Sequence, residues 1–437
     1  MPHDARHGRA RDLFTVWFGA NVMILTVVTG TLGPAIFHLG FAASLLAIAC
    51  GNLAGGIFMA LHAAQGPTLG VPQMVQSRGQ FGLWGAAAIM ILVVIMYGGF
   101  AASNLALGGT ACARIAPFLG HGGGIAAMVG FSAVPAVFGY RLIHAANRFA
   151  TVTGAIGFVA LAIATMPLWL SPTLWTTGHW SVAGFVGALS ISAVWQLAYA
   201  PFVSDYARYL PTGSQGSRHA FTATYGGSVA GSMLAMILGA LIGASGIRDA
   251  TDYLLHAGGL GHAGLALLMP GLMTANAMCL YCGALCAIGV AQTFRPKARF
   301  GAGSRISLTL VIAAATTLAG AAMSRDFLDS YTSMLAILMT MMVPWTAINL
   351  ADYYLVRHGH YDVDAFFAPD GGRYGLIDWR ACCAYVAGVL IQVPLIANPL
   401  YTGPLAFALG GIDLSWVAGL VGTGVLFLVL ARSRIST

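Results

Sequence analysis

The chain consists of long apolar stretches that alternate with short polar segments. A helix needs about 20 apolar residues to cross a lipid bilayer. On that length we predict twelve membrane spans, at residues 14–37, 41–62, 83–110, 123–140, 149–170, 183–204, 222–246, 262–292, 306–322, 330–355, 381–397 and 412–431. An even number of spans puts the two polar ends, residues 1–13 and 432–437, on the same side of the membrane.

Two of the predicted spans contain helix-breaking residues. Residues 29–34 (Thr-Gly-Thr-Leu-Gly-Pro) interrupt the first span, and residues 199–201 (Tyr-Ala-Pro) interrupt the sixth. Interrupted helices at corresponding positions of two five-span halves are typical of secondary transporters, whose substrate site lies near the middle of the membrane. A simple proline kink in each helix is the alternative interpretation.

Composition and charge agree with a membrane protein. The chain is 58% hydrophobic and only 8% charged, whereas a soluble domain carries about 25% charged residues. Of the 20 Lys and Arg residues, all but Arg114, Arg248 and Arg325 fall on the side of the termini. Because basic residues concentrate in cytoplasmic loops, we predict a multi-pass protein of the inner (plasma) membrane with both termini cytoplasmic. The basic residues are spread thinly, which argues against a nucleic acid partner.

The acidic residues limit the chemistry further. All 13 of them are aspartates, and none falls at the centre of a predicted span, which disfavours a proton relay through a carboxylate. The sequence has no carboxylate pair, His-rich helix or phosphate-binding glycine loop, so we expect neither an enzyme nor a bound cofactor. A receptor that binds without transporting would commonly need a signalling tail, and the predicted termini are short.

Three polar-flanked segments carry a more specific signal. They are residues 70–82 (GVPQMVQSRGQFG), 199–211 (YAPFVSDYARYLP) and 344–354 (PWTAINLADYY). In order and position they resemble the nucleobase:cation symporter family, which includes purine-cytosine and hydantoin permeases. The resemblance implies an all-α, leucine-transporter-like fold. Residues 14–170 and 183–355 would then form two inverted five-span repeats, and residues 381–431 would add two helices.

A flat heterocyclic base needs aromatic faces on its rings and amide groups at its edge. By the resemblance, Tyr97 lies where family members carry a stacking tryptophan. The second aromatic position matches Gln196, with Trp195 adjacent. Either Trp195 turns into the stacking role, or Gln196 bonds the base edge. Asn276, an amide in the middle of an apolar span, is our strongest substrate-binding candidate.

Asn104 is a weaker candidate for the same site. It lies two helical turns beyond Tyr97 on the same face of the predicted third span. An amide in such a position commonly bonds a neighbouring helix, and we expect that role for Asn104.

The resemblance also implies a cation site between spans 1 and 8. The ligands would be the carbonyl groups of Gly19 and Val22 together with Gly271, Thr274 and Ala275. Ala275 stands where sodium-coupled members tend to carry a second hydroxyl, so the set is one ligand short. The side-chain oxygen of Asn21 is a candidate replacement. Na⁺ is the expected coupling ion, with proton coupling and facilitated exchange as open alternatives.

The predicted function is import of a nucleobase, cytosine or a purine, by cation symport across the lipid bilayer. Spans 1, 2, 6 and 7 would rock against spans 3, 4, 8 and 9 and so expose the site to each side in turn. The same fold carrying another heterocycle is the alternative: allantoin, hydantoin, thiamine or the pyrimidine precursor of thiamine. These differ by a few pocket contacts, which the sequence does not distinguish.

Overall fold

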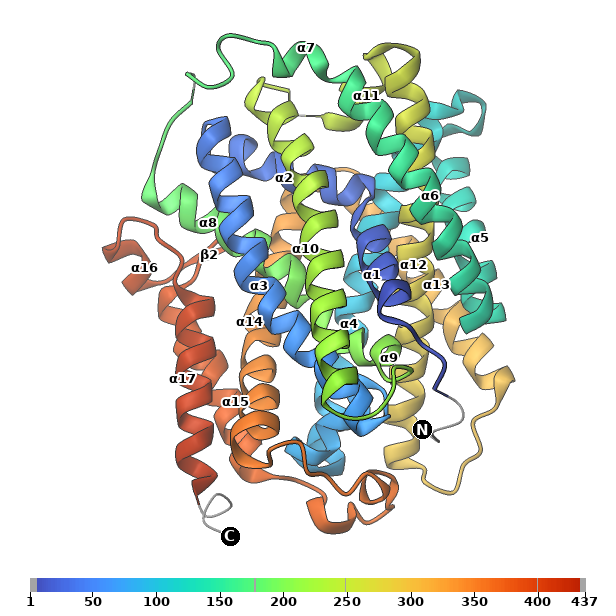
Figure 1. Ribbon diagram of the computed structural model, residues 1–437, viewed down its shortest axis with the longest axis vertical. Coiled ribbons are helices and arrows are strands. Elements are labelled where there is room, and N and C mark those ends of the chain that lie inside the picture. Colours follow the sequence, from blue (N-terminus) through green and yellow to red (C-terminus); the bar gives the residue numbers. More distant parts are fainter. Residues whose placement is uncertain (1–5, 177, 248, 399, 433–437) are drawn as a thin grey trace.

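The computed structural model describes residues 6–176, 178–247, 249–398 and 400–432. Two of the basic residues used for the orientation, Arg248 and Arg434, lie outside the described residues, as do the outermost parts of both predicted termini. The described chain is a bundle of long helices that run roughly parallel to one another (Figure 1).

In the described ranges, nine helical segments are long and apolar enough to cross a membrane, and a bent pair raises this number to ten. The nine are α3 (Phe41–Leu69), α4 (Gln73–Ile115), α5 (Gly120–Phe138), α6 (Tyr140–Ala164), α8 with α9 (Val182–Leu197 and Val203–Ala207), α10 (Ser214–Ala244), α12 (Gly258–Phe294), α13 (Ala302–Met323) and α14 (Phe327–Ala351). The bent pair is α1 (Ala10–Asn21) with α2 (Ile24–Ala35). The shorter apolar helices α15 (Trp379–Gln392) and α17 (Ser415–Leu430) coincide with the last two predicted spans.

Short elements connect these helices. They are α7 (Met166–Trp169), α11 (Ala250–His256), α16 (Pro404–Ala408), the π-helical turn η4 (Asp352–Val356), the 3₁₀ turns η2 (Pro117–Leu119), η3 (Ala200–Phe202), η5 (Asp364–Phe367), η6 (Gly372–Tyr374) and η7 (Val393–Leu395), and the antiparallel strands β1 (Ala397–Asn398) and β2 (Tyr401–Thr402).

The first predicted span is broken, but not at residues 29–34. It bends by 57° between α1 and α2, at Val22 and Met23: the backbone of Met23 is extended, and that of Val22, with φ −85° and ψ 73°, is not helical either. The prediction for residues 29–34 is wrong: these residues lie inside α2, and Pro34 stands one residue before the helix ends at Ala35, so that little helix follows the bond that proline cannot make. The break at residues 199–201 is confirmed, because α8 ends at Leu197 and η3 follows before α9.

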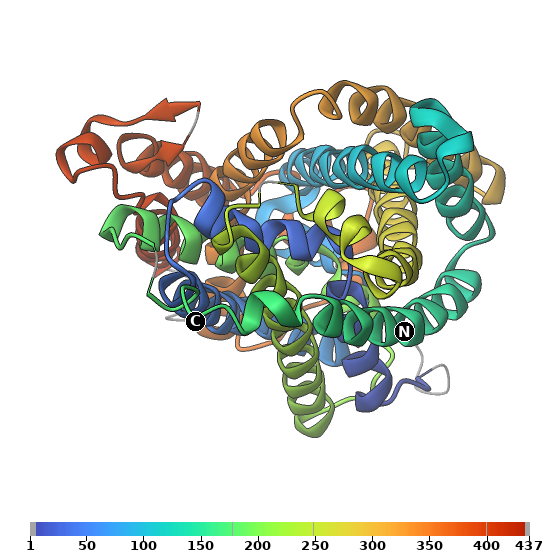
Figure 2. The same cartoon turned by 90° about the horizontal axis from the view of Figure 1, so that it is seen from above.

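The long helices form two groups. Helix α10 packs on α1, α2 and α3, and α3 packs on α8, whereas α12 packs on α4, α5 and α6, and α13 on α4. The two groups are joined by contacts of α1 with α6 and, less extensively, by contacts of α1 and α2 with α12. Helices α15 and α17 lie at the periphery (Figure 2).

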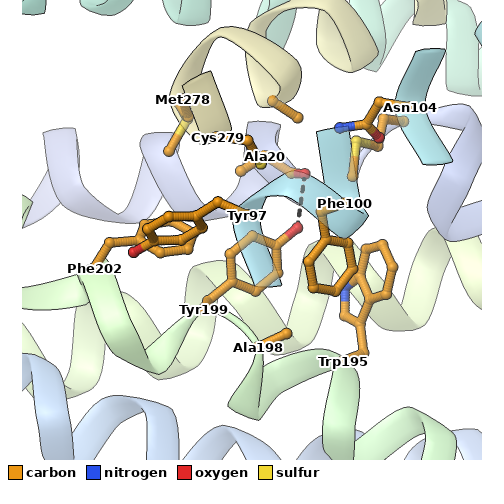
Figure 3. Close-up of a pocket in the computed structure, with 12 residues that line it drawn as sticks. Ala20, Tyr97, Phe100, Asn104, Trp195, Ala198, Tyr199, Phe202, Met278 and Cys279 are labelled. Atoms are coloured by element: carbon orange, nitrogen blue, oxygen red, sulfur yellow. Dashed lines mark hydrogen bonds between the residues drawn. The ribbon is translucent and has the colours of Figure 1, made fainter. Parts of the chain in front are cut away.

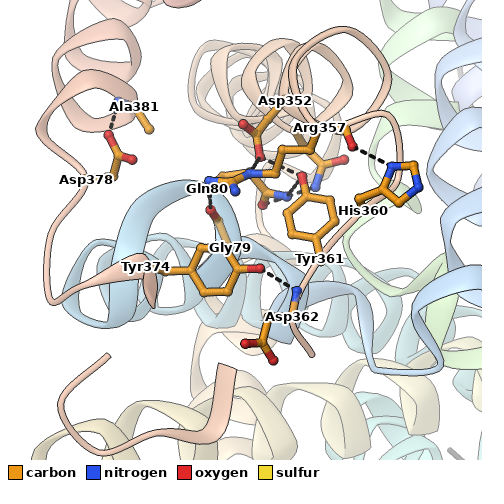
Figure 4. A network of polar contacts seen from close by, with 11 residues as sticks. Gly79, Gln80, Asp352, Arg357, His360, Tyr361, Asp362, Tyr374, Asp378 and Ala381 are labelled. Atoms are coloured by element: carbon orange, nitrogen blue, oxygen red, sulfur yellow. Dashed lines mark hydrogen bonds and ion pairs between the residues drawn. The ribbon is translucent and has the colours of Figure 1, made fainter. Parts of the chain in front are cut away.

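The start of α1 and the end of α17 face the same end of the molecule, together with the loop between α14 and α15 (Figure 1). A polar network holds that loop against the start of α4 (Figure 4). Helix α4 is kinked at Gly82, which has φ 75° and ψ 178°. There the loop supplies the missing partners: Leu83 N–H donates to Gly375 O at 3.0 Å and Trp84 N–H to Leu376 O at 2.7 Å.

Candidate functional site

A small cavity lies where the two broken spans meet α4 and α12. Its volume is about 40 Å³, and no charged side chain lines it. The break between α1 and α2, the face of α4, the end of α8 with η3, and the middle of α12 all contribute (Figure 3). The lining residues are Ala20, Met23, Tyr97, Phe100, Asn104, Trp195, Ala198, Tyr199, Phe202, Ala275, Met278 and Cys279.

Five aromatic rings form one wall of the cavity. Figure 3 shows Tyr199 between Phe202 and Trp195, with Tyr97 beside Phe202 and Phe100 beside Trp195. The rings meet edge to face, with centroids 5.5 Å apart for Tyr97 and Phe202 and 6.3 Å apart for Phe100 and Trp195. Such pairs add about 0.5–1.5 kcal/mol each beyond their burial. The wall is therefore a packed aromatic surface against which a flat ring can lie.

Two of the predicted substrate residues, Tyr97 and Trp195, lie in this wall. The Tyr97 hydroxyl is buried and has no hydrogen-bond partner. Gln196 is not brought to the cavity. Its amide donates to Asn52 Oδ1 at 2.8 Å and to Ser232 Oγ at 2.7 Å, among α3 and α10. Of the two residues offered as alternatives from the sequence, Trp195 is the one that lines the cavity.

Asn276 is completely buried, and neither its amide nitrogen nor its amide oxygen has a partner. It is the neighbour of Ala275, which lines the cavity, but does not itself line it. Asn104 lines the cavity, and its amide oxygen is also buried without a partner. A buried polar group without a partner costs about 1–3 kcal/mol. A polar ligand that bonded these amides would therefore relieve part of that cost.

The register between α4 and α12 sets these two residues at the same level of the helix interface. A Cβ atom on Gly108 would lie 2.8 Å from Leu272 Cδ2, and one on Gly283 would lie 3.8 Å from Tyr97 Cβ. The two helices therefore run antiparallel, and each step forward along α4 corresponds to an equal step backward along α12. Asn104 and Asn276 satisfy the same relation.

The predicted cation ligands are only partly brought together. The Val22 carbonyl, at the break, points at α12, because a Cβ on Gly271 would lie 3.2 Å from its oxygen. Thr274 lies one turn further along α12, and its hydroxyl donates to Pro270 O at 2.7 Å. Its lone pairs remain for a cation. Gly19, whose carbonyl is the other predicted ligand from α1, packs against the side chain of Thr151 on α6.

The two side chains discussed for the missing ligand differ: one has no oxygen, and the oxygen of the other is already engaged in a hydrogen bond. Ala275 faces the cavity and carries no oxygen on its side chain. The oxygen of Asn21 accepts a hydrogen bond of 2.6 Å from the Trp195 indole. The groups near α12 that fit a cation are therefore the Val22 carbonyl and the Thr274 hydroxyl.

Sequence reasoning missed the three other aromatic residues of the wall and gave Asn104 another role. Phe100 lies three residues after Tyr97, so helical periodicity puts it on the same face. Tyr199 and Phe202 flank the Ala-Pro step of the sixth span, where an aromatic residue beside unwound backbone is a usable signal. For Asn104, we expected a bond to another helix, and its oxygen makes none.

The family and the relatives to which this chain is similar are described as permeases. A family described as permease for cytosine/purines, uracil, thiamine, allantoin matches residues 1–419. YxlA of Bacillus subtilis (strain 168), provisionally named a purine-cytosine permease, is 37% identical over 446 residues, covering 100% of this chain and 95% of the relative. The purine-cytosine permease FCY2 of Saccharomyces cerevisiae is 26% identical over 54% of this chain and 45% of its own length.

Solved structures agree on the fold. The transporter Mhp1, of the nucleobase-cation-symport-1 family, in a closed conformation with bromovinylhydantoin bound, superposes with a TM-score of 0.80 at 18% identity, over 99% of this chain and 94% of that one. Its inward-facing conformation gives 0.75 at 17% identity, over 98% and 91%. A Na⁺-coupled sialic acid symporter gives 0.64 at 11% identity, over 99% and 91%.

Proposed function

The chain belongs to the family of permeases for cytosine/purines, uracil, thiamine and allantoin, and from this premise we propose that it imports cytosine or a purine by cation symport through alternating access. It is a multi-pass membrane transporter rather than an enzyme. In the proposal it has twelve spans, with residues 14–170 and 183–355 as inverted repeats. It lies in the plasma membrane with both termini in the cytoplasm.

One observation carries the substrate proposal: the cavity at the two breaks combines an aromatic wall with the Asn104 amide, whose oxygen has no partner, and the unpartnered amide of Asn276 follows directly on the lining residue Ala275. A base can lie against Tyr97 and Trp195, and stacking of this kind contributes about 1–3 kcal/mol per base. The amides of Asn104 and Asn276, whose buried atoms lack partners, supply donors and acceptors for the polar edge of the ring. Gln196 has no role in contacting substrate in this proposal.

The lining also ranks the alternatives. Thiamine carries a permanent positive charge, and burying an unpaired charge in an apolar site is very costly. The cavity has no charged residue to pair with it. Neutral heterocycles, including the bases, allantoin and hydantoin, avoid that cost. The absence of a carboxylate in the lining therefore supports a neutral substrate.

The cavity must widen before it can hold a base. Its volume of about 40 Å³ is enough for only a few water molecules, since each needs about 10–15 Å³ of such space. Movement of one helix group against the other supplies the space. The less extensive contacts of α1 and α2 with α12 mark the surface along which the two groups would move.

A second cavity supports a route toward the end of the molecule that carries the termini. It measures about 660 Å³ and is lined by the start of α1, by α6 and by the chain after α9. Thr151, which packs against Gly19, belongs to its lining. In the proposal a cation that leaves the Val22 carbonyl passes Gly19 into this cavity, with Na⁺ as the expected ion.

The test is uptake of labelled cytosine by proteoliposomes, with and without an imposed sodium gradient. Unlabelled adenine, uracil, allantoin, hydantoin and thiamine compete in parallel. We expect sodium-stimulated uptake that a purine or cytosine blocks and that thiamine does not. Uptake of allantoin, hydantoin or thiamine in place of cytosine and adenine would overturn the substrate assignment, while uptake that responds to a proton gradient alone would overturn sodium coupling.

A further inference from the structure

We propose that Asn21 is a positioning residue that holds the Trp195 indole in the wall of the cavity. The inference rests on the proposed function, because it assigns a role in substrate binding. Trp195 is 1% exposed and Asn21 is fully buried. The indole N–H donates to Asn21 Oδ1 at 2.6 Å. Asn21 does not line the cavity, so it would act on a bound base through Trp195.

The Asn21 amide is itself fixed from both sides. Its nitrogen donates to Trp17 O at 2.7 Å and to Ser228 Oγ at 3.1 Å. With the oxygen accepting from the indole, both N–H groups and one of the two oxygen lone pairs of this amide are used. Rotation of the side chain would therefore break bonds in a buried site, where an unsatisfied polar group is costly.

The chain of hydrogen bonds continues in one direction away from the cavity. An indole nitrogen can only donate, so Asn21 must present its oxygen to Trp195 and its NH₂ group to Ser228. Ser228 Oγ then donates to Gln196 Oε1 at 2.6 Å, and the Gln196 NH₂ group donates to Asn52 and Ser232. This assigns Gln196 a role at the far end of the network that orients Trp195.

The position of Asn21 explains why this contact matters for the cavity. Asn21 is the last residue of α1, and the break follows at Val22. The preceding carbonyl, that of Ala20, accepts a hydrogen bond of 3.3 Å from the Tyr199 hydroxyl. Two neighbouring residues at the end of α1 thus hold two of the five aromatic rings, and a shift of α1 at the break would move the wall that faces the base.

A double-mutant cycle tests this role. The variants are Asn21→Leu, Trp195→Phe and the two combined, in the full-length protein, with the dissociation constant for labelled cytosine as the readout. We expect each single change to weaken binding about tenfold, the size of a lost buried hydrogen bond with one partner left unsatisfied. The double variant should be no weaker than the weaker single variant, because both changes remove the same bond.

A matched control separates positioning from general loss of packing. The Trp416 indole donates to Ser190 Oγ at 2.9 Å, between α17 and α8 and away from the cavity. Trp416→Phe removes a similar bond and should leave the dissociation constant unchanged. Binding by Asn21→Leu that equals the parent, or losses that multiply in the double variant, would overturn the proposal.

A second readout needs no ligand and keeps this inference separate from the proposed function. The emission of Trp195 is obtained by subtracting the spectrum of a Trp195→Phe variant, once in the parent and once in the Asn21→Leu background. We expect the Trp195 maximum to move to shorter wavelength when the amide partner is lost. Identical difference spectra would refute the role of Asn21. A parent protein that binds no base would refute the proposed function alone.

Discussion

Arg357 and Asp352 form an ion pair in which the arginine Nε–H donates to Asp352 Oδ2 at 2.9 Å. The Asp352 side chain is completely buried and that of Arg357 is 15% exposed. The Tyr361 hydroxyl donates to the same carboxylate oxygen. Burial and then the nearby Asp352 carboxylate raise the pKa of Tyr361 well above its usual range, so the phenol keeps its proton. The pair joins the end of α14 to the loop that follows it (Figure 4).

Replacing Arg357 by Met should destabilise the protein. The change leaves the buried Asp352 carboxylate without its cation, which typically costs about 3–5 kcal/mol. The thermal unfolding midpoint of detergent-purified protein should fall clearly. Arg11→Met is the control, because the Arg11 and Asp12 side chains are 74% and 64% exposed and exposed pairs contribute little. Equal midpoints for the two variants would contradict this prediction.

Replacing Asn276 by Ala should weaken substrate binding without destabilising the fold. Both polar atoms of its amide are buried without partners, so their removal breaks no hydrogen bond and relieves a desolvation cost of about 1–3 kcal/mol. Asn52→Ala is the comparison, since Asn52 accepts bonds from Gln196 and Ser232 and its loss should lower the unfolding midpoint. Saturable uptake by the Asn276 variant with an unchanged KM would remove this residue from the site.

Replacing Thr274 by Ala should raise the sodium concentration that gives half-maximal uptake. The hydroxyl lies one turn from Gly271, which faces the Val22 carbonyl, and its lone pairs are lost in the variant. Thr274→Ser keeps the oxygen and should behave like the parent. If sodium dependence is the same in all three proteins, the cation binds elsewhere.

Replacing Gly239 by Ala should disturb the packing of α10 on α2. A Cβ atom at this position would collide with the backbone carbonyl of Val27, and overpacking of this kind costs about 1–3 kcal/mol. Gly424→Ala in α17 is the matched control, because nothing lies within 4 Å of a Cβ there. We expect a lower unfolding midpoint for the first variant and an equal or higher one for the second.

The positions of the helices followed from the sequence because a bilayer requires long apolar segments. The break in the first span did not. Glycine and proline at residues 29–34 suggested an interruption there, yet the helix continues, and Thr29 and Thr31 donate to carbonyls of its preceding turn. The actual break at Val22 is accommodated by glycines on other helices, Gly154 and Gly271, which allow its carbonyl to approach. No local pattern in the first span contains that information.

The candidate site was predictable in its chemistry and less so in its geometry. Tyr97 and Trp195, which the family resemblance implied as aromatic contacts, line the cavity. The direction of Gln196 depends on Ser228, Ser232 and Asn52, which are distant in sequence and offer its amide a complete set of partners. Whether an amide faces a cavity or a network is decided by such tertiary contacts, which a single sequence does not reveal.

The backbone hydrogen bonds between the loop and the kink of α4 have a practical consequence for labelling the protein. Because Gly375 and Leu376 complete the backbone bonding of Leu83 and Trp84, this stretch of loop is effectively part of the helix. An epitope tag or a fluorescent reporter inserted there would separate those bonds and disrupt α4. The exposed turn at residues 295–301, between α12 and α13, is the better insertion point, since exposed loop tips tolerate added residues.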